Sequence, residues 1–389
     1  MNVRILHIVG DSKYGGGSYI ILRLAQMAHA AGWEPWVLTT DPVFQQVLAE
    51  NDISYTDCAF IAREINPFRD LRALRELTTY LRTHRFDIVH THTSKGGFIG
   101  RRAAWNARVP AIIHTVHGFA FHEQSSPVMV RFYASIERMA ARWCHKIVTV
   151  SRYHREWAMQ LKIATPSKLV AIPNGLDPLR VEPSQPVDAI RRALQIRPDA
   201  PVILSTGRLA TQKGFEYLIE AVNHLKRQHS QPFQVIIAGE GPLKDSLQKQ
   251  IHRLGLDAYV RLIGFYKAIG DLYAIADLVV LPSLWEGLSI ALLEAMASGK
   301  PIITTTIGSN LEATDQGRAA LLVPPKDAPA LARAILQLLS DPDQSARYAH
   351  LAYNHFVQHY TETRMLEQYH QLYREVLDAA RSDTRCSGK

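Results

Sequence analysis

The feature that limits the fold of this chain most is a regular alternation of short apolar runs with amphipathic stretches long enough to form helices. The apolar runs are continuous, which is typical of parallel strands buried on both faces of a sheet. Strands that alternate with helices predict doubly wound parallel sheets. The predicted strands are residues 3–9, 34–39, 87–92, 111–117, 146–150 and 168–172, followed after a break by residues 202–206, 234–238, 259–263, 278–281, 301–305 and 319–323.

A proline-rich segment divides this alternation into two halves. Residues 173–186 read PNGLDPLRVEPSQP, and four prolines with a glycine exclude a regular helix or a central strand. We therefore predict two Rossmann-like α/β domains, residues 1–176 and residues 177–362. We expect residues 363–389 to form a helix that packs back on the first domain. Ligands of such sheets bind at the carboxyl ends of the strands, so we expect a site in a cleft between the domains.

Composition indicates a folded protein without a membrane span. Apolar residues make up 47% of the chain and charged residues 21%, which excludes the disordered, collagen-like and coiled-coil classes. No apolar stretch approaches the ~20 residues that span a bilayer, and no signal-peptide pattern precedes the first strand. Cys58, Cys144 and Cys386 lack metal-ligand spacing and cannot all pair, which favours a reducing compartment. We expect a cytoplasmic protein.

The positive charge is confined to the first half of the chain. The formal net charge is +8, yet residues 1–180 hold 22 basic and 14 acidic side chains while the remaining residues hold 22 of each. Two predicted helices carry arginine stripes. One stripe contains Arg72, Arg75 and Arg82, and the other contains Arg131, Arg138, Arg142 and His145, opposite an apolar face of Met129, Phe132, Ile136, Met139 and Trp143.

Each stripe singly is explained by a core-packed helix with a solvated basic back. Two such helices in one domain favour contact with an anionic membrane surface, where each nearby cation contributes ~1 kcal/mol. Nucleic acid is not predicted as a partner, because no nucleic-acid-binding motif and no interleaved aromatic side chains accompany these arginines.

Glycine-rich turns follow the first strand of each half. Residues 10–18 read GDSKYGGGS, and such a turn lets the backbone approach a phosphate at a helix N-terminus, although a plain tight turn fits it equally well. It matches neither the P-loop nor the GxGxxG pattern. In the second half, GRLATQKG places Arg208 and Lys213 on one loop. Two fixed cations suit a diphosphate leaving group, on which negative charge builds as its bond breaks.

Two glutamates follow the later strands of the second half. Residues 239–242 read GEGP, and residues 282–299 read PSLWEGLSIALLEAMASG. Glu286 precedes a glycine at a strand-to-helix turn, and Glu294 lies about two helical turns further along. A carboxylate accepts two hydrogen bonds at once and therefore suits the vicinal hydroxyls of a ribose or hexose, although a solvated helix face explains either glutamate singly.

Taken in order, the motifs GRLxxxKG, GEGP and PSLxEGx(6)EAMAxG closely resemble the nucleotide-sugar-dependent retaining glycosyltransferases of family 4. The resemblance extends over essentially the whole chain, because IPNGLD at residues 172–177 and the early glycine loop also fall where that family has them. It implies the GT-B fold, with an acceptor-side domain, a donor domain and a cleft between them. The stretches HTHTSKGGFIGRRAAW and HTVHGFAFHE resemble the bacterial capsule and exopolysaccharide branch.

The resemblance implies roles for the matching positions. Arg208 and Lys213 would hold the donor diphosphate, Glu286 would bond hydroxyls of the donor sugar, and Glu294 would bond the ribose. The other donor-binding positions are Gly16, Gly17 and Gly239, with the amides of Leu288, Ser289 and Ile290. The family usually has proline where Ser289 stands, and a second glycine where Ser309 follows Gly308. These departures concern the shape of the sugar pocket.

Histidines end two strands of the first half. His117 matches the position at which the family places a histidine against the donor sugar, so we group it with the catalytic residues Arg208, Lys213 and Glu286. His90, His92 and Lys95 are assigned to the acceptor side. For His90, His92 and His114 the alternative is a buried imidazole bonded to the backbone.

No metal is predicted. The histidines are not accompanied by a cysteine or carboxylate at ligand spacing. Asp341-Pro342-Asp343 spells the DxD of metal-dependent glycosyltransferases, yet its proline and its position after a predicted helix fit a helix stop better.

We therefore expect an enzyme at the inner face of the cytoplasmic membrane that moves a hexose or N-acetylhexosamine from a nucleotide-diphosphate sugar, with UDP favoured, to a lipid-linked saccharide of a capsule, exopolysaccharide or lipopolysaccharide. The donor is a co-substrate, and no cofactor is predicted. Retention of the anomeric configuration is implied by the family resemblance alone. We expect it to proceed by a same-face mechanism. The alternatives are a UDP-sugar 2-epimerase of the same fold and a non-catalytic nucleotide-sugar sensor, which two cations with two glutamates disfavour.

Overall fold

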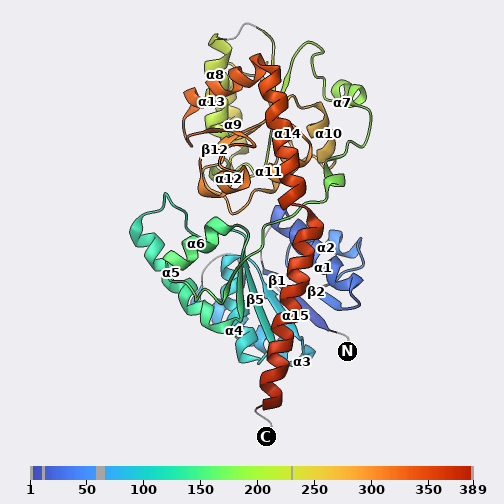
Figure 1. Cartoon of the computed structure of the whole chain (residues 1–389), viewed down its shortest axis with the longest axis vertical. Coiled ribbons are helices and arrows are strands. Elements are labelled where there is room, and N and C mark those ends of the chain that lie inside the picture. The colour runs from blue at the N-terminus through green and yellow to red at the C-terminus, as the bar shows by residue number, and fades with distance from the viewer. Residues whose placement is uncertain (1–2, 11–13, 58–65, 229–230, 387–389) are drawn as a thin grey trace. The chain divides into compact units, whose positions relative to one another are not determined.

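The computed structural model describes residues 3–10, 14–57, 66–228 and 231–386. The chain forms two compact units, of which unit 1 comprises residues 1–174 and 363–389 and unit 2 comprises residues 175–362 (Figure 1). Cys58 and residues 11–13 of the first glycine loop lie outside the described residues. In the described part of the chain, no helix is both long and apolar enough to cross a bilayer.

Seven parallel strands form the sheet of unit 1, in the order β3-β2-β1-β4-β5-β6-β7. Their bounds are β1 Arg4–Gly10, β2 Glu34–Thr39, β3 Ser54–Thr56, β4 Ile88–Thr91, β5 Ala111–Val116, β6 Lys146–Thr149 and β7 Leu169–Ala171. The strands predicted in this half are all present. The sequence missed β3, a three-residue edge strand whose Ser54 and Tyr55 are exposed, so that no apolar run marks it.

Apolar side chains of unit 1 cover both faces of its sheet. Leu6 and Ile8 of β1 belong to one core cluster and Val9 belongs to another, because successive residues of a strand point to opposite faces. The helices that supply the rest are α1 Gly16–Ala30, α2 Pro42–Ala49, α3 Pro67–His84, α4 Ser94–Asn106, α5 Pro127–Ala140 and α6 Arg152–Gln160.

The last helix, α15 (Glu362–Cys386), packs within unit 1. Its Tyr369 and Tyr373 are fully buried there. The Tyr373 hydroxyl lies 2.6 Å from Nδ1 of His90, and the Tyr369 hydroxyl lies 3.0 Å from Oγ1 of Thr115. The polar contacts of α15 therefore reach the carboxyl ends of β4 and β5.

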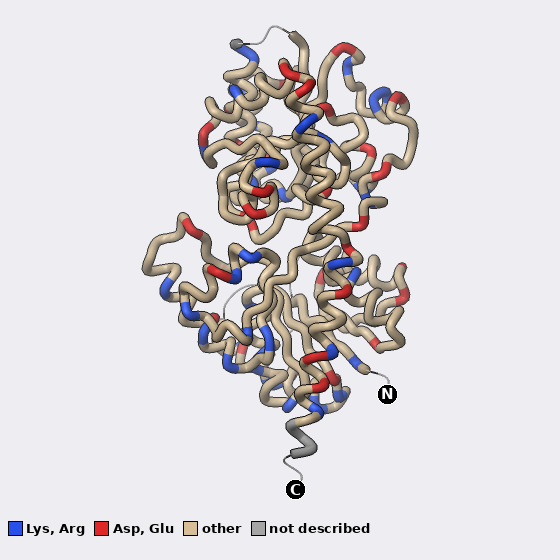
Figure 2. Tube along the Cα trace, in the orientation of Figure 1, with Lys and Arg blue, Asp and Glu red and all other residues tan. Residues whose placement is uncertain are grey.

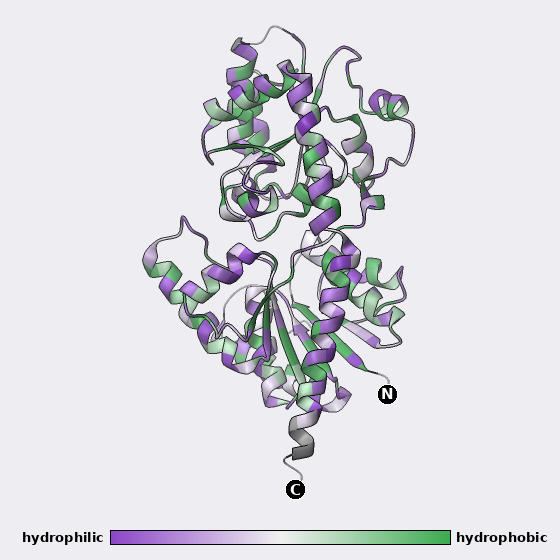
Figure 3. Cartoon of the chain, viewed as in Figure 1, coloured by the Kyte–Doolittle hydropathy of each residue, from purple (hydrophilic) through white to green (hydrophobic). Residues whose placement is uncertain are grey.

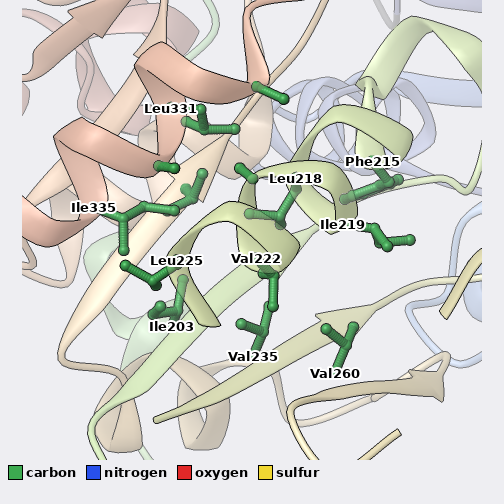
Figure 4. Close-up of a cluster of buried hydrophobic side chains, with 14 of the residues drawn as sticks. Ile203, Phe215, Leu218, Ile219, Val222, Leu225, Val235, Val260, Leu331 and Ile335 are labelled. Carbon is green, nitrogen blue, oxygen red and sulfur yellow. The ribbon is translucent and has the colours of Figure 1, made fainter. Parts of the chain in front are cut away.

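Six parallel strands form the sheet of unit 2, in the order β10-β9-β8-β11-β12-β13. Their bounds are β8 Val202–Thr206, β9 Gln234–Ala238, β10 Val260–Gly264, β11 Leu278–Leu281, β12 Ile302–Thr305 and β13 Leu321–Val323, so the strands predicted in this half are all present. Figure 4 shows the core on one face, where Ile203 of β8 and Val235 of β9 lie beneath Leu218 and Leu225.

The helices of unit 2 are α7 Val187–Ala193, α8 Phe215–Gln228, α9 Lys244–Arg253, α10 Ile269–Ile275, α11 Ile290–Ala297, α12 Gly308–Ala313, α13 Ala328–Ser340 and α14 Pro342–His359. Figure 3 shows hydrophobic residues concentrated along the strands, whereas the helices alternate in character. Between α13 and α14, the Asp341 carboxylate accepts a 2.9 Å hydrogen bond from the backbone N–H of Gln344. Asp341 thus caps α14 and marks the helix stop that the sequence predicted.

Candidate active site

In unit 2, the loop after β8 lies against the loop after β11. Gly214 adopts a left-handed conformation with φ +64°, and a Cβ atom there would come within 2.2 Å of the carbonyl oxygen of Pro282. The backbone N–H of Leu284 donates to the carbonyl of Gln212 over 2.8 Å. Only glycine permits this approach, which brings the end of the first loop to Glu286 on the second.

Lys213 and Glu286 form a direct ion pair, and their side chains are only 17% and 7% exposed. Glu286 Oε1 also accepts from the Ser283 hydroxyl over 3.0 Å, and Oε2 accepts from the Gln212 amide over 3.0 Å. Arg208, in contrast, is exposed, and no side-chain partner of its guanidinium is found among the residues that the structure describes. The structure therefore brings Lys213 and Glu286 together and leaves Arg208 available to a ligand.

Glu294 is held on α11 by two partners. Its Oε1 accepts a 2.8 Å bond from Nε of Arg180, and its Oε2 accepts a 3.2 Å bond from the Tyr273 hydroxyl. Burial, followed by the neighbouring Glu294 charge, raises the pKa of Tyr273 well above its usual value, so the phenol stays a donor. The sequence did not single out Arg180, which lies in the proline-rich segment on a short 3-10 turn (Pro178–Val181).

Packing within unit 2 also explains some of the residues predicted to bind the donor through their backbone. At Gly239, where φ is +149°, a Cβ atom would come within 1.9 Å of the carbonyl oxygen of Gly207, so close packing alone requires glycine there. Leu288 and Ser289 are buried, and Ile290 begins α11. The Oγ atoms of Ser289 and Ser309, the two departures from the family pattern, are buried and find no hydrogen-bond partner among the described residues.

Unit 1 has a cavity of about 120 Å³ at the carboxyl ends of β1, β4 and β5. Gly17, at the start of α1, lines it, and a Cβ atom there would lie 3.9 Å from Cγ of His117. His92, His114 and Glu137 also line the cavity. Gly16 precedes Gly17 as the first residue of α1.

A chain of three imidazoles runs from the core to this cavity. His7 Nδ1 lies 3.1 Å from His92 Nε2, and His92 Nδ1 lies 3.1 Å from His117 Nε2. Burial lowers the pKa of His7 to about 3 and that of His117 to about 4. Burial and neighbouring imidazoles lower the pKa of His92 well below 6.5. All three rings are therefore neutral near pH 7. The sequence missed His7, although pairing of β1 with β4 sets it directly beside His90.

His90 and His114 are also buried, and of these two only His114 is bonded to the backbone, as the alternative interpretation expects. His114 Nδ1 lies 3.1 Å from the backbone carbonyl of Thr91. His90 instead uses side chains, with Nδ1 at 2.6 Å from Tyr373 and Nε2 at 2.7 Å from Thr115. Burial is the largest cause that lowers the pKa of both rings well below 6.5.

His7, His90 and His92 are the group in the described ranges whose nitrogen atoms come close enough for a metal ion, within 4.8 Å of one another. Both nitrogens of His90 and of His92 already have partners, and only Nε2 of His7 has none. One unpartnered nitrogen does not make a ligand set. That the protein needs no metal stays a prediction.

Charged residues of unit 1 near the cavity are paired. Lys95 of α4 forms a 2.7 Å ion pair with Asp70 of α3 and does not line the cavity. Glu137 lines the cavity and bonds Nη2 of the fully buried Arg101 over 2.8 Å. The sequence missed the Arg101–Glu137 pair, because the two residues are 36 positions apart on α4 and α5.

The predicted basic stripes lie on the surface of unit 1 (Figure 2). Arg72 pairs with Glu76 at 2.7 Å, Arg82 donates to the carbonyl of Asn106 at 2.9 Å, and Arg138 donates to carbonyls after α6. For Arg75, Arg131 and Arg142, which are exposed, the described residues supply no partner.

The apolar face of α5 does not pack on the core as the sequence suggested. Val128 is 76% exposed, Met129 46%, Phe132 59% and Met139 42%. Small residues, Ala134 and Ala140, are the buried positions of this helix. The large side chains of α5 therefore form an exposed apolar surface beside the exposed arginines.

Comparisons with known proteins match both halves of the chain. A family model described as Glycosyltransferase Family 4 matches residues 14–180, and one described as Glycosyl transferases group 1 matches residues 186–355. The UDP-Gal:alpha-D-GlcNAc-diphosphoundecaprenol alpha-1,3-galactosyltransferase of Escherichia coli is 33% identical over 253 residues. This alignment covers 64% of the chain and 65% of that protein, slightly less than two thirds of its length.

A second relative aligns over most of the chain. The putative glycosyltransferase EpsD of Bacillus subtilis is 28% identical over 356 residues, which cover 89% of this chain and 90% of that protein. Among solved structures, Anabaena HepE in complex with UDP and glucose has a TM-score of 0.82 at 22% identity, covering 96% of this chain and 100% of that one. WaaG, a glycosyltransferase involved in lipopolysaccharide biosynthesis, has a TM-score of 0.75 at 17% identity, covering 95% of this chain and 99% of that one. These likenesses concern the fold, and they confirm the predicted GT-B fold.

Proposed function

Because the chain belongs to the family 4 glycosyltransferases, we propose that it is a retaining enzyme that transfers a hexose or N-acetylhexosamine from a UDP-sugar to a lipid-linked saccharide. The relatives support the two substrate classes. The name of the E. coli relative specifies a UDP-galactose donor and a diphosphoundecaprenol-linked acceptor, and HepE was crystallised with UDP and with UDP-glucose.

The observation that carries this proposal is the Lys213–Glu286 ion pair at the carboxyl ends of β8 and β11, with the exposed Arg208 on the same loop as Lys213. When a sugar leaves a diphosphate, negative charge develops on the phosphate oxygens, and preorganised cations stabilise it. Arg208 is exposed and can reach such a group, while Lys213 can exchange Glu286 for a phosphate oxygen. Glu286, once released, accepts hydrogen bonds from sugar hydroxyls.

Retention of configuration fits the same cluster. In the same-face mechanism, the departing phosphate oxygen draws the proton from the acceptor hydroxyl as the new bond forms. This mechanism needs no carboxylate nucleophile, and Glu286 accepts bonds from Lys213, Ser283 and Gln212 through both of its oxygens. We assign the enzyme to cell-surface polysaccharide synthesis, in the class of capsule, exopolysaccharide or lipopolysaccharide, with no metal cofactor.

A donor screen followed by a transfer assay tests the proposal. A bound donor stabilises the folded state by mass action, so thermal shift with a panel of nucleotide sugars should identify one that raises Tm. The purified protein should then transfer its sugar to a lipid-linked saccharide with retained configuration, as read by NMR of the new linkage. An inverted linkage would contradict the mechanism.

The same incubation without acceptor separates the alternatives. A 2-epimerase would convert the UDP-sugar to its epimer, whereas a transferase would give only slow hydrolysis. A sensor would bind the donor tightly and neither hydrolyse nor transfer it.

We further propose that α5 anchors the enzyme to the inner face of the cytoplasmic membrane. Exposed Phe132 and Met139 lie on the same helix as exposed Arg131 and Arg138, which suits insertion at an anionic bilayer surface. The protein should co-sediment with anionic liposomes at low salt. Replacement of Arg131, Arg138 and Arg142 by Ser, or of Phe132 by Ser, should release it. Arg192→Ser, which changes an exposed arginine of unit 2, is the control.

A further inference from the structure

Helix α5 places one charged side chain, that of Glu137, on the face that it turns toward unit 1. The buried residues of this helix are Ala134 and Ala140, three positions before Glu137 and three positions after it. Residues three apart share one face of a helix, so Glu137 takes an inward position that packing would ordinarily fill with an apolar residue. The Glu137 side chain is only 13% exposed.

A fully buried arginine accompanies this carboxylate. Nη2 of Arg101 donates to Glu137 Oε2 over 2.8 Å, and Nε of Arg101 donates to the carbonyl of Gly97 over 2.9 Å. Removing two charges from water costs several kcal/mol per ion, and apolar residues of similar volume often stabilise a fold equally well or better. Stability alone therefore gives no reason for the Arg101–Glu137 pair, which points to a role in binding.

One oxygen of Glu137 is available to a ligand. Oε2 is bonded to Arg101, whereas Oε1 has no hydrogen-bond partner among the described residues and is not fully enclosed. Glu137 lines the cavity at the carboxyl ends of β1, β4 and β5, and it supplies the one carboxylate among the described residues that line it. An ionised carboxylate accepts hydrogen bonds and has no proton to donate, so its ligand must present a hydroxyl or an amide N–H.

The position of Glu137 on α5 favours the acceptor saccharide as that ligand. The same helix carries exposed Phe132 and Met139, the side chains that we propose to contact the membrane. A lipid-linked saccharide reaches the enzyme from the membrane surface and therefore meets the helix that bears Glu137. Phe119, which also lines the cavity, offers an apolar ring beside the carboxylate.

We propose that Glu137 is a specificity-determining residue whose Oε1 accepts a hydrogen bond from a non-reacting hydroxyl of the acceptor saccharide, while Arg101 holds Oε2. The inference rests on the proposed function, because it takes the ligand to be a lipid-linked saccharide. Glu137 then selects acceptors with a hydroxyl within reach. It disfavours acceptors with a carboxylate or phosphate in that place, which would bring two hydrogen-bond acceptors face to face.

Acceptors that lack single hydroxyls test this contact. The probes are prenyl-diphosphate-linked glucose, galactose and N-acetylglucosamine with their monodeoxy analogues, used with the UDP-sugar that raises Tm in the donor screen. Removal of one non-reacting hydroxyl should lower kcat/KM of the native protein about tenfold, as expected for a lost hydrogen bond to a charged group. This penalty should be smaller in Glu137→Gln, whose amide oxygen is a weaker acceptor, and absent in Arg101→Met/Glu137→Met.

The double variant separates the contact from any effect on folding. It removes both charges at once, so no buried guanidinium is left unpaired and Tm should stay near the native value. Arg4→Met/Glu34→Met is the matched control, because it removes a 3.1 Å ion pair of unit 1 at the amino ends of β1 and β2. The control should show the native penalty with every analogue.

The outcomes that overturn the inference are distinguishable. If every deoxy analogue has the same penalty in the native protein and in both Glu137 variants, the Arg101–Glu137 pair is structural. If the variants slow hydrolysis of the donor without acceptor, Glu137 contacts the donor sugar instead. Both results leave the proposed function intact. If the native protein transfers to none of the lipid-linked sugars, the proposed function itself fails, and the inference fails with it.

Discussion

The two units share one architecture, yet the groups at the carboxyl ends of their strands differ in kind. In unit 1 these ends carry neutral imidazoles that bond one another, as in the His7–His92–His117 chain. In unit 2 they carry opposite charges in direct contact, Lys213 with Glu286, and a second such pair joins Arg180 of the proline-rich segment to Glu294 of α11. Parallel sheets thus fix where a site lies, while the residues after each strand decide what it can bind.

This difference shows that the net charge of a unit does not predict the charge of the groups at its site. The excess of basic residues lies in the first half of the chain, but the cavity of unit 1 is lined by uncharged histidines and by Glu137, whose charge Arg101 balances. The second half has no net charge, and it contains the cations suited to a diphosphate. Net charge therefore describes the surface of this protein and says little about its chemistry.

Removal of a charge from unit 2 should have the largest effect on activity. We expect Lys213→Ala to lower kcat by about 10²- to 10³-fold, because loss of one preorganised donor to a developing anion costs that much in other enzymes. Tm should fall modestly, because the nearly buried Glu286 loses its ion-pair partner but keeps its bonds to Ser283 and Gln212. Single-turnover transfer of donor sugar gives the measurement, and unaltered turnover would refute the role of Lys213 in leaving-group stabilisation.

Lys244 provides the matched control for this substitution. It pairs with Glu240 in the same unit at 3.0 Å, but both side chains are about half exposed. Exposed pairs contribute little to stability. Lys244→Ala should therefore transfer sugar at the native rate, so that a loss confined to Lys213→Ala is assigned to the site.

The elements that the sequence predicted are those whose signal is local. Strands buried on both faces, such as Ala111–Val116, appear as continuous apolar runs, and Gly214 marks a left-handed turn. The exposed edge strand Ser54–Thr56 has no such signal. For α5, periodicity identified an apolar face without identifying what covers it, and most large side chains of that face are exposed in the structure.

The site partners that the sequence missed come from distant positions. His7 reaches His92 across 85 positions, and Arg180 reaches Glu294 across 114. Only the register of parallel strands or the path of the proline-rich segment brings them together. The motifs predicted Glu286 and Lys213 individually, while their mutual ion pair became visible only in the structure.

Acid should destabilise unit 1 before unit 2. The pKa values of His7 and His117 fall to about 3 and 4 in the folded protein, and those of His90, His92 and His114 fall well below 6.5. Below pH 6.5 these histidines therefore bind protons in the unfolded chain but not in the folded chain. Their stabilising effect is complete above pH 6.5 and is lost as pH falls, by about 1.4 kcal/mol per pH unit for each neutral histidine.

Hydrogen exchange measured at pH 7.5 and at pH 5 checks this prediction unit by unit. After correction for the slower intrinsic exchange at the lower pH, peptides of β4 and β5 should show reduced protection at pH 5, while the protection of β8 and β11 should change little. His7→Phe removes one of the buried groups and should reduce the dependence of unfolding free energy on pH by about one proton. Equal acid sensitivity of the two units would show that the imidazoles do not set them apart.

The smallest expected effect on ligand binding concerns Arg180, a charged residue of unit 2 that is not predicted to contact the diphosphate. Arg180 orients Glu294 through a 2.8 Å bond, and Glu294 is assigned to the ribose. Arg180→Ala should therefore weaken binding of UDP and of UMP by the same factor, roughly three- to tenfold, as expected for one lost hydrogen-bond interaction. The exposed Arg197, paired with Asp199, supplies a control whose substitution should change neither affinity. A loss that appears with UDP and not with UMP would place Arg180 at the β-phosphate and join it to the leaving-group cations.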